Sequence, residues 1–394
     1  TEIYTLSLHD ALPICQTSLS EGTRQNIEAA LSDRFDLILK SLALRRSLTE
    51  DDVRAVFNNR DDFVITASNA KELKLVDHVL SRTAMLDTLK LDSEKLVAIA
   101  DYSTPKSMPK GNKIAVLYLS GNIMPNTGNF NQSTISHAKV KKMVEQIVKD
   151  STVKAAVLRI DSPGGSALES ELIYQELLKL KPKMPIVVSM GGVAASGGYY
   201  ISCAANKVVA DEGTITGSIG VIMMLPETTG LGKKIGIRSQ TIKFGKYAGA
   251  FNAFEPVSPQ LIESLKRSST GTYNEFKSRV MSARGITPDK INSIAEGRVY
   301  SAEDALAVNL IDEIGSLETA ISQAANLASV TKYEVQNYPR KISFFDAIKD
   351  SDILKMYLRS VFSHKILNTD DLAKELFEQF EPFSWQYLMP YSMD

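Results

Sequence analysis

Two glycine-rich segments of the sequence combine small residues with hydroxyl groups in a way that suits acyl-transfer chemistry. They read DSPGGS at Asp161–Ser166 and GGVAASGG at Gly191–Gly198. Glycine lets a backbone turn sharply and present N–H groups to an anion, as an oxyanion hole or a phosphate cradle requires. Neither segment matches the P-loop or the dinucleotide fingerprint. Ser196 stands between small residues where a helix is predicted to open, which suits a nucleophile; a helix-capping serine is the alternative.

A serine nucleophile needs a general base, and the sequence offers no histidine near these segments. The four histidines have no metal-ligand spacing, and the two cysteines stand far apart, so no metal site, disulfide framework or histidine-based triad is predicted. These residues are His9, His78, His137, His364, Cys15 and Cys203. We expect a lysine base, whose pKa burial would lower.

Composition excludes several classes of protein. The chain has 394 residues, with 45 Lys and Arg against 46 Asp and Glu, and a net charge of −1 gives no electrostatic reason to expect nucleic acid. Met184–Asn206 lacks charged residues, but its glycines and serines favour a buried strand, a turn and a buried helix over a membrane span. No signal-peptide pattern and no cofactor motif is predicted, so location cannot be read directly.

Alternating elements must position the glycine-rich segments. Apolar runs predict strands at 114–121, 155–161, 185–190 and 207–211, with a turn at 191–198. Helices are predicted from the spacing of Val140, Met143, Val144 and Ile147, from the composition of 169–181, and after Ser196. Such alternation implies a largely parallel sheet with right-handed crossovers, and chemistry collects at the carboxyl ends of its strands.

An internal repeat lies on both sides of this region. Ala67–Asp77 resembles Ala302–Asp312, and a motif at 48–53 resembles one at 286–291, roughly 235 residues later. We therefore expect two copies of one unit, the second complete and the first represented only by its C-terminal part.

The first residues of the chain have a different character. TEIYTLSLHDALPI at residues 1–14 resembles a translated sequencing adapter, and we exclude it from fold reasoning. The predicted divisions are 1–15, an adapter-like artefact; 16–100, the remnant of the first repeat; 101–330, the second repeat with the candidate nucleophile; and 331–394, a tail. The tail has amphipathic pieces and crowded aromatic residues, which suggest a partner surface, a membrane interface or packing onto the domain.

DSPGGS, GGVAASGGYYIS and TGSIGV at Thr216–Val221 together resemble the protease IV family, the long duplicated form of signal peptide peptidase A. The resemblance covers residues 16–335 and implies an α/β fold that is a duplicated crotonase-like, Clp-protease-like unit. It also implies that Ser196 is the nucleophile and that Ser218 orients the base lysine. The oxyanion would be held by amides of Gly164 or Gly165 and of Gly197.

The sequence departs from the family pattern at the position of the general-base lysine. Single-repeat relatives carry the lysine in Gly-x-Tyr-Lys, whereas this chain reads Gly245-Lys246-Tyr247-Ala248. In duplicated members the first copy supplies the lysine and the second the serine, so Ala248 is expected. We therefore expect this chain to be nearly inactive alone. Lys246 is the substitute candidate, and a solvated surface lysine is the alternative reading.

The resemblance implies a serine peptidase with a Ser/Lys dyad and no cofactor. It would degrade cleaved signal peptides and other hydrophobic peptides at the periplasmic face of a bacterial inner membrane, as a membrane-associated homo-oligomer, a tetramer. Two other readings stay open, a crotonase-like acyl-CoA enzyme and a non-catalytic scaffold. The serines at 196 and 218 favour the peptidase, since a hydratase needs no nucleophile.

Overall fold

The computed structural model describes residues 2–7, 20–58, 65–91, 96, 111–125, 134–242 and 249–339, with only the backbone at 2–7 and 224–227. The chain divides into two units, Thr1–Pro339 and Arg340–Asp394. Most of the predicted tail, Cys15, Lys246 and the predicted boundary at residue 100 therefore lie outside the described residues. Within the described ranges, no helix is both long enough and apolar enough to cross a bilayer.

Eight strands form one mixed sheet in the order β10-β8-β6-β5-β2-β12, with β7 beside β6 and β11 beside β7. All neighbours are parallel except β10, which runs antiparallel to β8. The predicted strands are confirmed as β2, β5, β6 and β7, and so is the largely parallel sheet. The strands are β2 (Asn112–Ser120), β5 (Val153–Ser162), β6 (Ile186–Ala195), β7 (Lys207–Ala210), β8 (Ile215–Gly217), β10 (Val299–Tyr300), β11 (Glu313–Ile314) and β12 (Tyr333–Tyr338).

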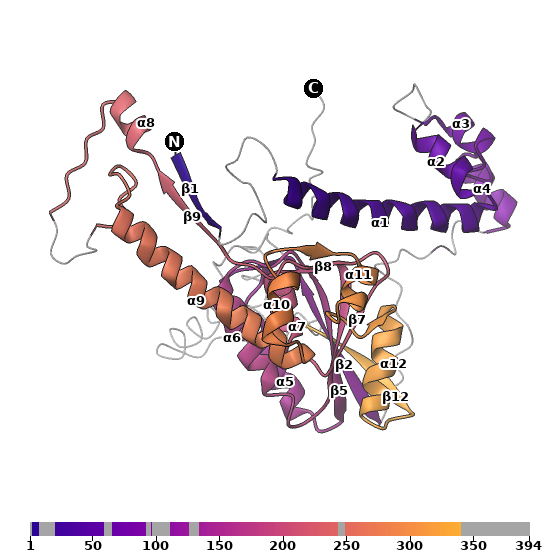
Figure 1. Ribbon diagram of the computed structural model, residues 1–394. Coiled ribbons are helices and arrows are strands. Elements are labelled where there is room, and N and C mark those ends of the chain that lie inside the picture. Colours follow the sequence, from indigo (N-terminus) through magenta and orange to yellow (C-terminus); the bar gives the residue numbers. More distant parts are fainter. Residues whose placement is uncertain are drawn as a thin grey trace, which may run out of the picture. The chain divides into compact units, whose positions relative to one another are not determined.

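Alternate residues of the strands face two different layers of helices (Figure 1). Ile114 and Val116 of β2 pack in one cluster with alanines of α12 (Leu317–Leu327), while Ala115 and Leu117 pack in the other. This second cluster includes residues of α5 (His137–Lys149), α6 (Ala167–Leu178), α7 (Gly197–Ser202), α9 (Pro259–Arg284), α10 (Pro288–Ile294) and α11 (Ala302–Ala307). The helix predicted from Val140 to Ile147 is confirmed, since those four residues are the buried face of α5. Both faces of the sheet are thus covered, which explains its near-continuous apolar strands.

Strand β6 is longer than the sequence predicts. The segment 191–198 is not a turn throughout, because β6 continues to Ala195. Ile160 of β5 pairs with Met190, but Ser162 pairs with Ala194, so β6 carries two extra residues between these pairs. Gly191 and Gly192 form this bulge. It lets the first half of β6 pair with β7 and the second half with β8.

The internal repeat is visible in the helices. The series α1 (Glu21–Arg46), α2 (Glu50–Asn58), α3 (Ala67–Glu72) and α4 (Arg82–Leu89) begins at the positions that match the starts of α9, α10, α11 and α12. Both long helices have 26 residues and end in a left-handed residue, Ser47 or Gly285. These elements support the predicted duplication.

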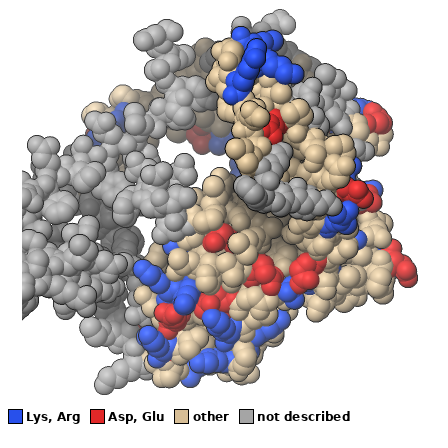
Figure 2. Space-filling view, turned by 90° about the vertical axis from the view of Figure 1, so that its left-hand side faces the viewer, with Lys and Arg blue, Asp and Glu red and all other residues tan. Residues whose placement is uncertain are grey.

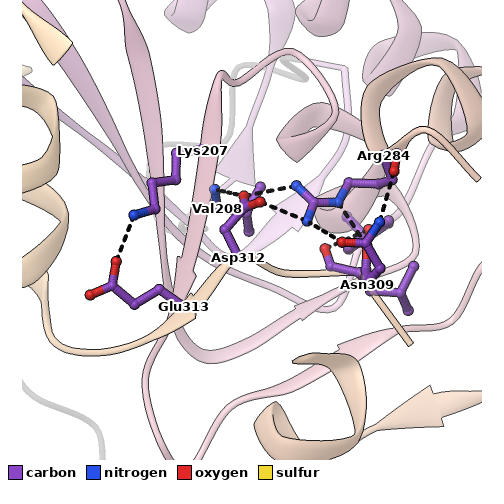
Figure 3. A network of polar contacts seen from close by, with 8 residues as sticks. Lys207, Val208, Arg284, Asn309, Asp312 and Glu313 are labelled. Carbon is purple, nitrogen blue, oxygen red and sulfur yellow. Dashed lines mark hydrogen bonds and ion pairs between the residues drawn. The ribbon is translucent and has the colours of Figure 1, made fainter. Parts of the chain in front are cut away.

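The same ionic clamp closes both series. Arg46 donates to the carboxylate of Asp77 at 2.9 and 3.0 Å and to the carbonyl of Lys74 at 2.7 Å. Arg284 donates to the carboxylate of Asp312 at 2.8 and 2.9 Å and to the carbonyl of Asn309 at 2.9 Å, as Figure 3 shows. The matching residues Lys74 and Asn309 both have a positive φ. The clamp is therefore a property of the repeated unit.

Smaller elements complete the described residues. They are β1 (Glu2–Ser7), β9 (Ile222–Glu227), α8 (Thr229–Lys234), β3 (Asn122–Ile123) and β4 (Thr134–Ile135). The segment that we excluded as adapter-like supplies β1, which pairs antiparallel with β9. Ile123 of β3 forms an isolated bridge with Gly165, and this contact anchors the first glycine-rich turn.

Candidate active site

Ser196 occupies the junction between β6 and α7 in a strained conformation. Its φ is 51° and its ψ is −118°, a region that residues with a Cβ rarely adopt. Its N–H donates to the carbonyl of Gly217 at 2.9 Å, and its own carbonyl accepts from the N–H of Tyr200 at 2.8 Å. The Ser196 side chain makes no capping hydrogen bond, so the alternative role as a helix cap is wrong. A serine held on a strained strand-to-helix turn is the geometry of a nucleophile elbow. The helix predicted after Ser196 is confirmed as α7, which has six residues.

The DSPGGS turn lies directly against Ser196. Gly164 has a φ of 99°, and a Cβ built there would lie 2.6 Å from the nitrogen of Gly197 and 2.8 Å from the Cβ of Ser196. A Cβ on Gly197 would in turn lie 3.4 Å from the Cα of Gly164. Only glycine at position 164 permits this approach of the two backbones.

The amide hydrogens of the two turns differ in their partners. The N–H of Gly164 donates to the hydroxyl of Ser162 at 3.1 Å. Among the described residues, the N–H groups of Gly165 and Gly197 have no hydrogen-bond acceptor. Both glycines line the cavity described next. The pair Gly165 and Gly197 therefore suits an oxyanion better than Gly164 does.

A cavity of about 830 Å³ opens over these turns and brings most of the predicted site together. Ser196, Gly197, Gly165 and Ser218 all contribute to its wall. Gly164 lies behind this wall, against Ser196. The face of the molecule in Figure 2 is hollowed, and the visible wall of the hollow is mostly uncharged. The cavity is large enough for several side chains of a peptide.

Ser218 is held on the third motif, directly after β8. It has a φ of 49°, and its N–H donates to the carbonyl of Arg298 at 2.7 Å. The preceding Gly217 also has a positive φ, and a Cβ there would lie 2.7 Å from the ring of Tyr300. These contacts hold the Ser218 backbone at the wall of the cavity that contains Ser196.

No lysine or histidine that could serve as the general base lines the described part of the cavity beside Ser196. The described cavity wall contains no lysine, arginine or histidine. The backbone N–H of His137 donates to the carboxylate of Glu169 at 2.7 Å, the ring Nε2 of His137 lies 3.6 Å from Glu176, and His78 is exposed. Within the described ranges, no group of three His, Cys, Asp or Glu side chains is placed to bind a metal.

The residues after Ser196 anchor α7. Tyr199 is buried and donates its hydroxyl to the carbonyl of Leu310 at 2.7 Å. Burial raises the pKa of Cys203 to about 12, so this thiol is a packing residue. Asp161 accepts from the N–H of Val193 at 3.0 Å and so brackets the bulge of β6.

Sequence reasoning missed several charged and aromatic residues in the wall of the cavity. Glu171, Glu275, Phe276 and Tyr200 all line it. Glu171 is 108 residues from its partner Arg279. A single sequence carries no periodic signal for a contact of that separation.

Two family models match overlapping parts of the chain. The model of "Peptidase family S49" matches residues 179–331, and that of "Clp protease" matches residues 118–214. The chain is 28% identical to the chloroplastic serine protease SPPA of Arabidopsis thaliana, over 93% of this chain and 55% of that protein. It is 33% identical to protease 4 of Salmonella typhi, over 73% and 47% of the two chains. The chain thus spans about half the length of these two relatives.

A shorter relative is covered more completely. A putative protease of Methanocaldococcus jannaschii is 36% identical over 58% of this chain and 75% of that protein. Among solved structures, a ClpP1 mutant from Listeria monocytogenes is 14% identical, with a TM-score of 0.36 and coverage of 52% of this chain and 94% of that chain. The S49 model includes Ser196 and Ser218, and the match to the archaeal relative extends over most of that relative's length. The chain belongs to peptidase family S49.

Proposed function

We propose that this chain is the nucleophile-bearing part of a serine peptidase in which Ser196 attacks a peptide carbonyl. One observation carries the proposal: Ser196, in a strained strand-to-helix turn and without a side-chain capping bond, lines a cavity beside two amide groups that have no acceptor among the described residues. The hydroxyl oxygen of Ser196 would bond to the carbonyl carbon as its proton passes to a base. The amides of Gly165 and Gly197 would stabilise the negative oxygen that results.

The base in this proposal is a lysine, and Ser218 orients it. Support comes from the resemblance and from the position of Ser218 on the wall of the same cavity. Since the described wall contains no lysine, the base comes from elsewhere. Lys246 is one candidate. The other is a lysine from the first copy of the repeat, as in duplicated members. If the second candidate is the base, the chain alone would be nearly inactive.

The substrates that we propose are cleaved signal peptides and other hydrophobic peptides. Leu168, Val221, Ile222 and Phe276 give the cavity an apolar wall that suits such side chains. We further propose action at the periplasmic face of a bacterial inner membrane, as a tetramer. This part of the proposal rests on the resemblance.

The division of the chain remains part of the proposal. The matched helices and the shared clamp support an assignment of residues 16–100 to a first repeat and 101–330 to a second.

A fluorophosphonate probe tests the nucleophile. If Lys246 is the base, we expect labelling at Ser196 of the 394-residue chain; otherwise we expect it once a lysine-bearing first copy is added. Labelling should be lost in Ser196→Ala and retained in Ser258→Ala, which removes an ordinary cap of α9. Ser218→Ala should slow labelling without removing it, because Ser218 is assigned to orient the base. If Lys246 is the base, Lys246→Ala should slow it equally.

Three outcomes would contradict the proposal. Turnover of an acyl-CoA ester without labelling of Ser196 would favour the crotonase-like enzyme. If neither acyl-CoA turnover nor labelling of Ser196 is seen, in the chain alone or after addition of a lysine-bearing first copy, the result would favour a scaffold. Hydrolysis of a hydrophobic peptide that Ser196→Ala leaves unchanged would also refute the assignment.

A further inference from the structure

We propose that Arg279 is a positioning residue that ties the Ser196 turn to the Gly164–Gly165 turn. It acts through Glu171 and Tyr200, neither of which the resemblance assigns a role. The inference rests on the proposed function, because it concerns how the nucleophile and the oxyanion amides are held relative to each other.

The contacts form one chain across three helices. Arg279 of α9 donates from Nη2 to Oε1 of Glu171 on α6 at 3.0 Å. The other oxygen of the same carboxylate, Oε2, accepts a hydrogen bond from the hydroxyl of Tyr200 on α7. Arg279 also pairs with Glu275, one turn earlier on α9, at 2.5 Å. A single carboxylate therefore joins α6 to α7, and Arg279 joins both to α9.

Aromatic rings surround this chain of contacts. The rings of Tyr174 and Tyr200 meet edge to face with centroids 5.8 Å apart, and Tyr200 and Phe276 have centroids 4.9 Å apart. The guanidinium of Arg279 lies over the ring of Tyr174 at 4.9 Å. Such partly enclosed, charge-assisted contacts are stronger than surface ion pairs. Burial, and then the hydrogen bond to Glu171, raise the pKa of Tyr200, so its hydroxyl stays a donor at neutral pH.

The two helices that Glu171 joins begin at the two catalytic turns. Helix α6 starts at Ala167, directly after Gly164 and Gly165, and α7 starts at Gly197, directly after Ser196. The strained φ of Ser196 persists only if its surroundings hold it. A link from Glu171, the fifth residue of α6, to Tyr200, the fourth residue of α7, fixes the N–H groups of Gly165 and Gly197 relative to each other. Preorganised donors of this kind need to be placed to within about 0.5 Å.

Comparison of the two repeats shows which arginines of α9 belong to the repeated helical unit. Arg284 has an equivalent, Arg46, which makes the same clamp. The position that matches Arg279 on the repeated helix α1 is Ser41, which cannot form an ion pair. Arg279 therefore belongs to the copy that carries the nucleophile and not to the repeated helical scaffold.

The test compares Arg279→Met and Arg279→Lys with Arg267→Met in the full chain. Arg267 is the matched control, an exposed arginine on the same helix that pairs with Glu263. Backbone amide exchange is followed in peptides from 162–170, 193–203 and the β2 and β5 strands, together with the rate of Ser196 labelling by a fluorophosphonate. We expect Arg279→Met to speed exchange about tenfold in both turns but not in the strands. Labelling of Ser196 in Arg279→Met should slow by about tenfold or more. Arg279→Lys should restore part of the exchange protection and part of the labelling rate. Arg267→Met should change neither the exchange nor the labelling rate.

Each outcome decides the inference. Unchanged exchange in either turn would overturn it, and so would an equal rise in β2 and β5, which would make Arg279 an ordinary stabilising residue. If Ser196 is labelled neither in the unaltered chain nor after addition of a lysine-bearing first copy, the proposed function fails while the exchange result still decides the positioning role. Should Arg279→Met fail to fold, Tyr200→Phe replaces it, with faster exchange expected at 193–203 but not at 162–170.

Discussion

Gly164→Ala tests whether the close approach of the two turns matters. The added Cβ would lie 2.6 Å from the Gly197 nitrogen, 2.8 Å from the Ser196 Cβ and 2.9 Å from the Ala195 carbonyl oxygen. Two of these three atoms belong to backbone, so no flexible side chain can move aside. The turn itself must shift away from Ser196.

The size of the effect follows from two costs. Alanine at a φ of 99° is strained by about 1–2 kcal/mol relative to glycine. Forcing a methyl group into a packed site costs about 1–3 kcal/mol more. We therefore expect a loss of about 2–5 kcal/mol in the free energy of unfolding. A shift of about 1 Å in an oxyanion donor lowers the rate by about a hundredfold.

Urea denaturation and the rate of fluorophosphonate labelling measure the two effects. The matched control is Gly192→Ala, since a Cβ on this glycine of the β6 bulge has its nearest neighbour at 3.7 Å. The control should change stability by less than about 1 kcal/mol. Stability and labelling in Gly164→Ala equal to those of the control would refute the geometry of the site.

Three further predictions concern residues whose contacts are described above. Ser196→Gly should abolish labelling yet raise the free energy of unfolding by about 1 kcal/mol in a denaturant titration, because glycine relieves the strained φ. In the same titration Arg284→Met should cost about 2–4 kcal/mol and Arg46→Met clearly less, because the Arg284 side chain is 7% exposed against 21% for Arg46; equal costs would contradict the comparison. A hydrogen bond from Thr152, followed by one from Lys113, lowers the pKa of Asp150 to about 2. Its stabilisation, at most about 2 kcal/mol, should be complete above pH 4 and lost as the pH falls toward 2, and unfolding measured against pH should lose this slope in Asp150→Asn.

The strand pattern and the repeat could be predicted from the sequence because both are local. Apolar runs such as 114–121 predict β2 and β5 correctly, and the motif at Ala67–Asp77 predicts a match with Ala302–Asp312 that the helices reproduce. The turn prediction at 191–198 is wrong in part because two glycines in a strand also permit a bulge. Pairing of β6 with β8 makes this segment a bulged strand and not a turn, and the local sequence of the segment does not reveal that pairing.

The predicted site residues come together because each one follows the end of a strand. Ser196 and Ser218 come directly after β6 and β8, and Gly164 and Gly165 come just beyond the end of β5. The parallel sheet carries all three ends to one edge. The Glu171–Arg279 contact could not be predicted in this way, because it joins two helix faces whose register depends on tertiary packing.

The repeated clamp also bears on the order in which the chain folds. Arg46 and Asp77 are 31 residues apart, and Arg284 and Asp312 are 28 apart. The contact from Val208 to Asp312, which brings the end of the second clamp to strand β7, spans 104 residues. Because closing a longer loop costs more entropy, each helical series should close early and the sheet should recruit it afterwards. Asp312 takes part in both events, so the residue that closes the local loop also presents the assembled helices to the sheet.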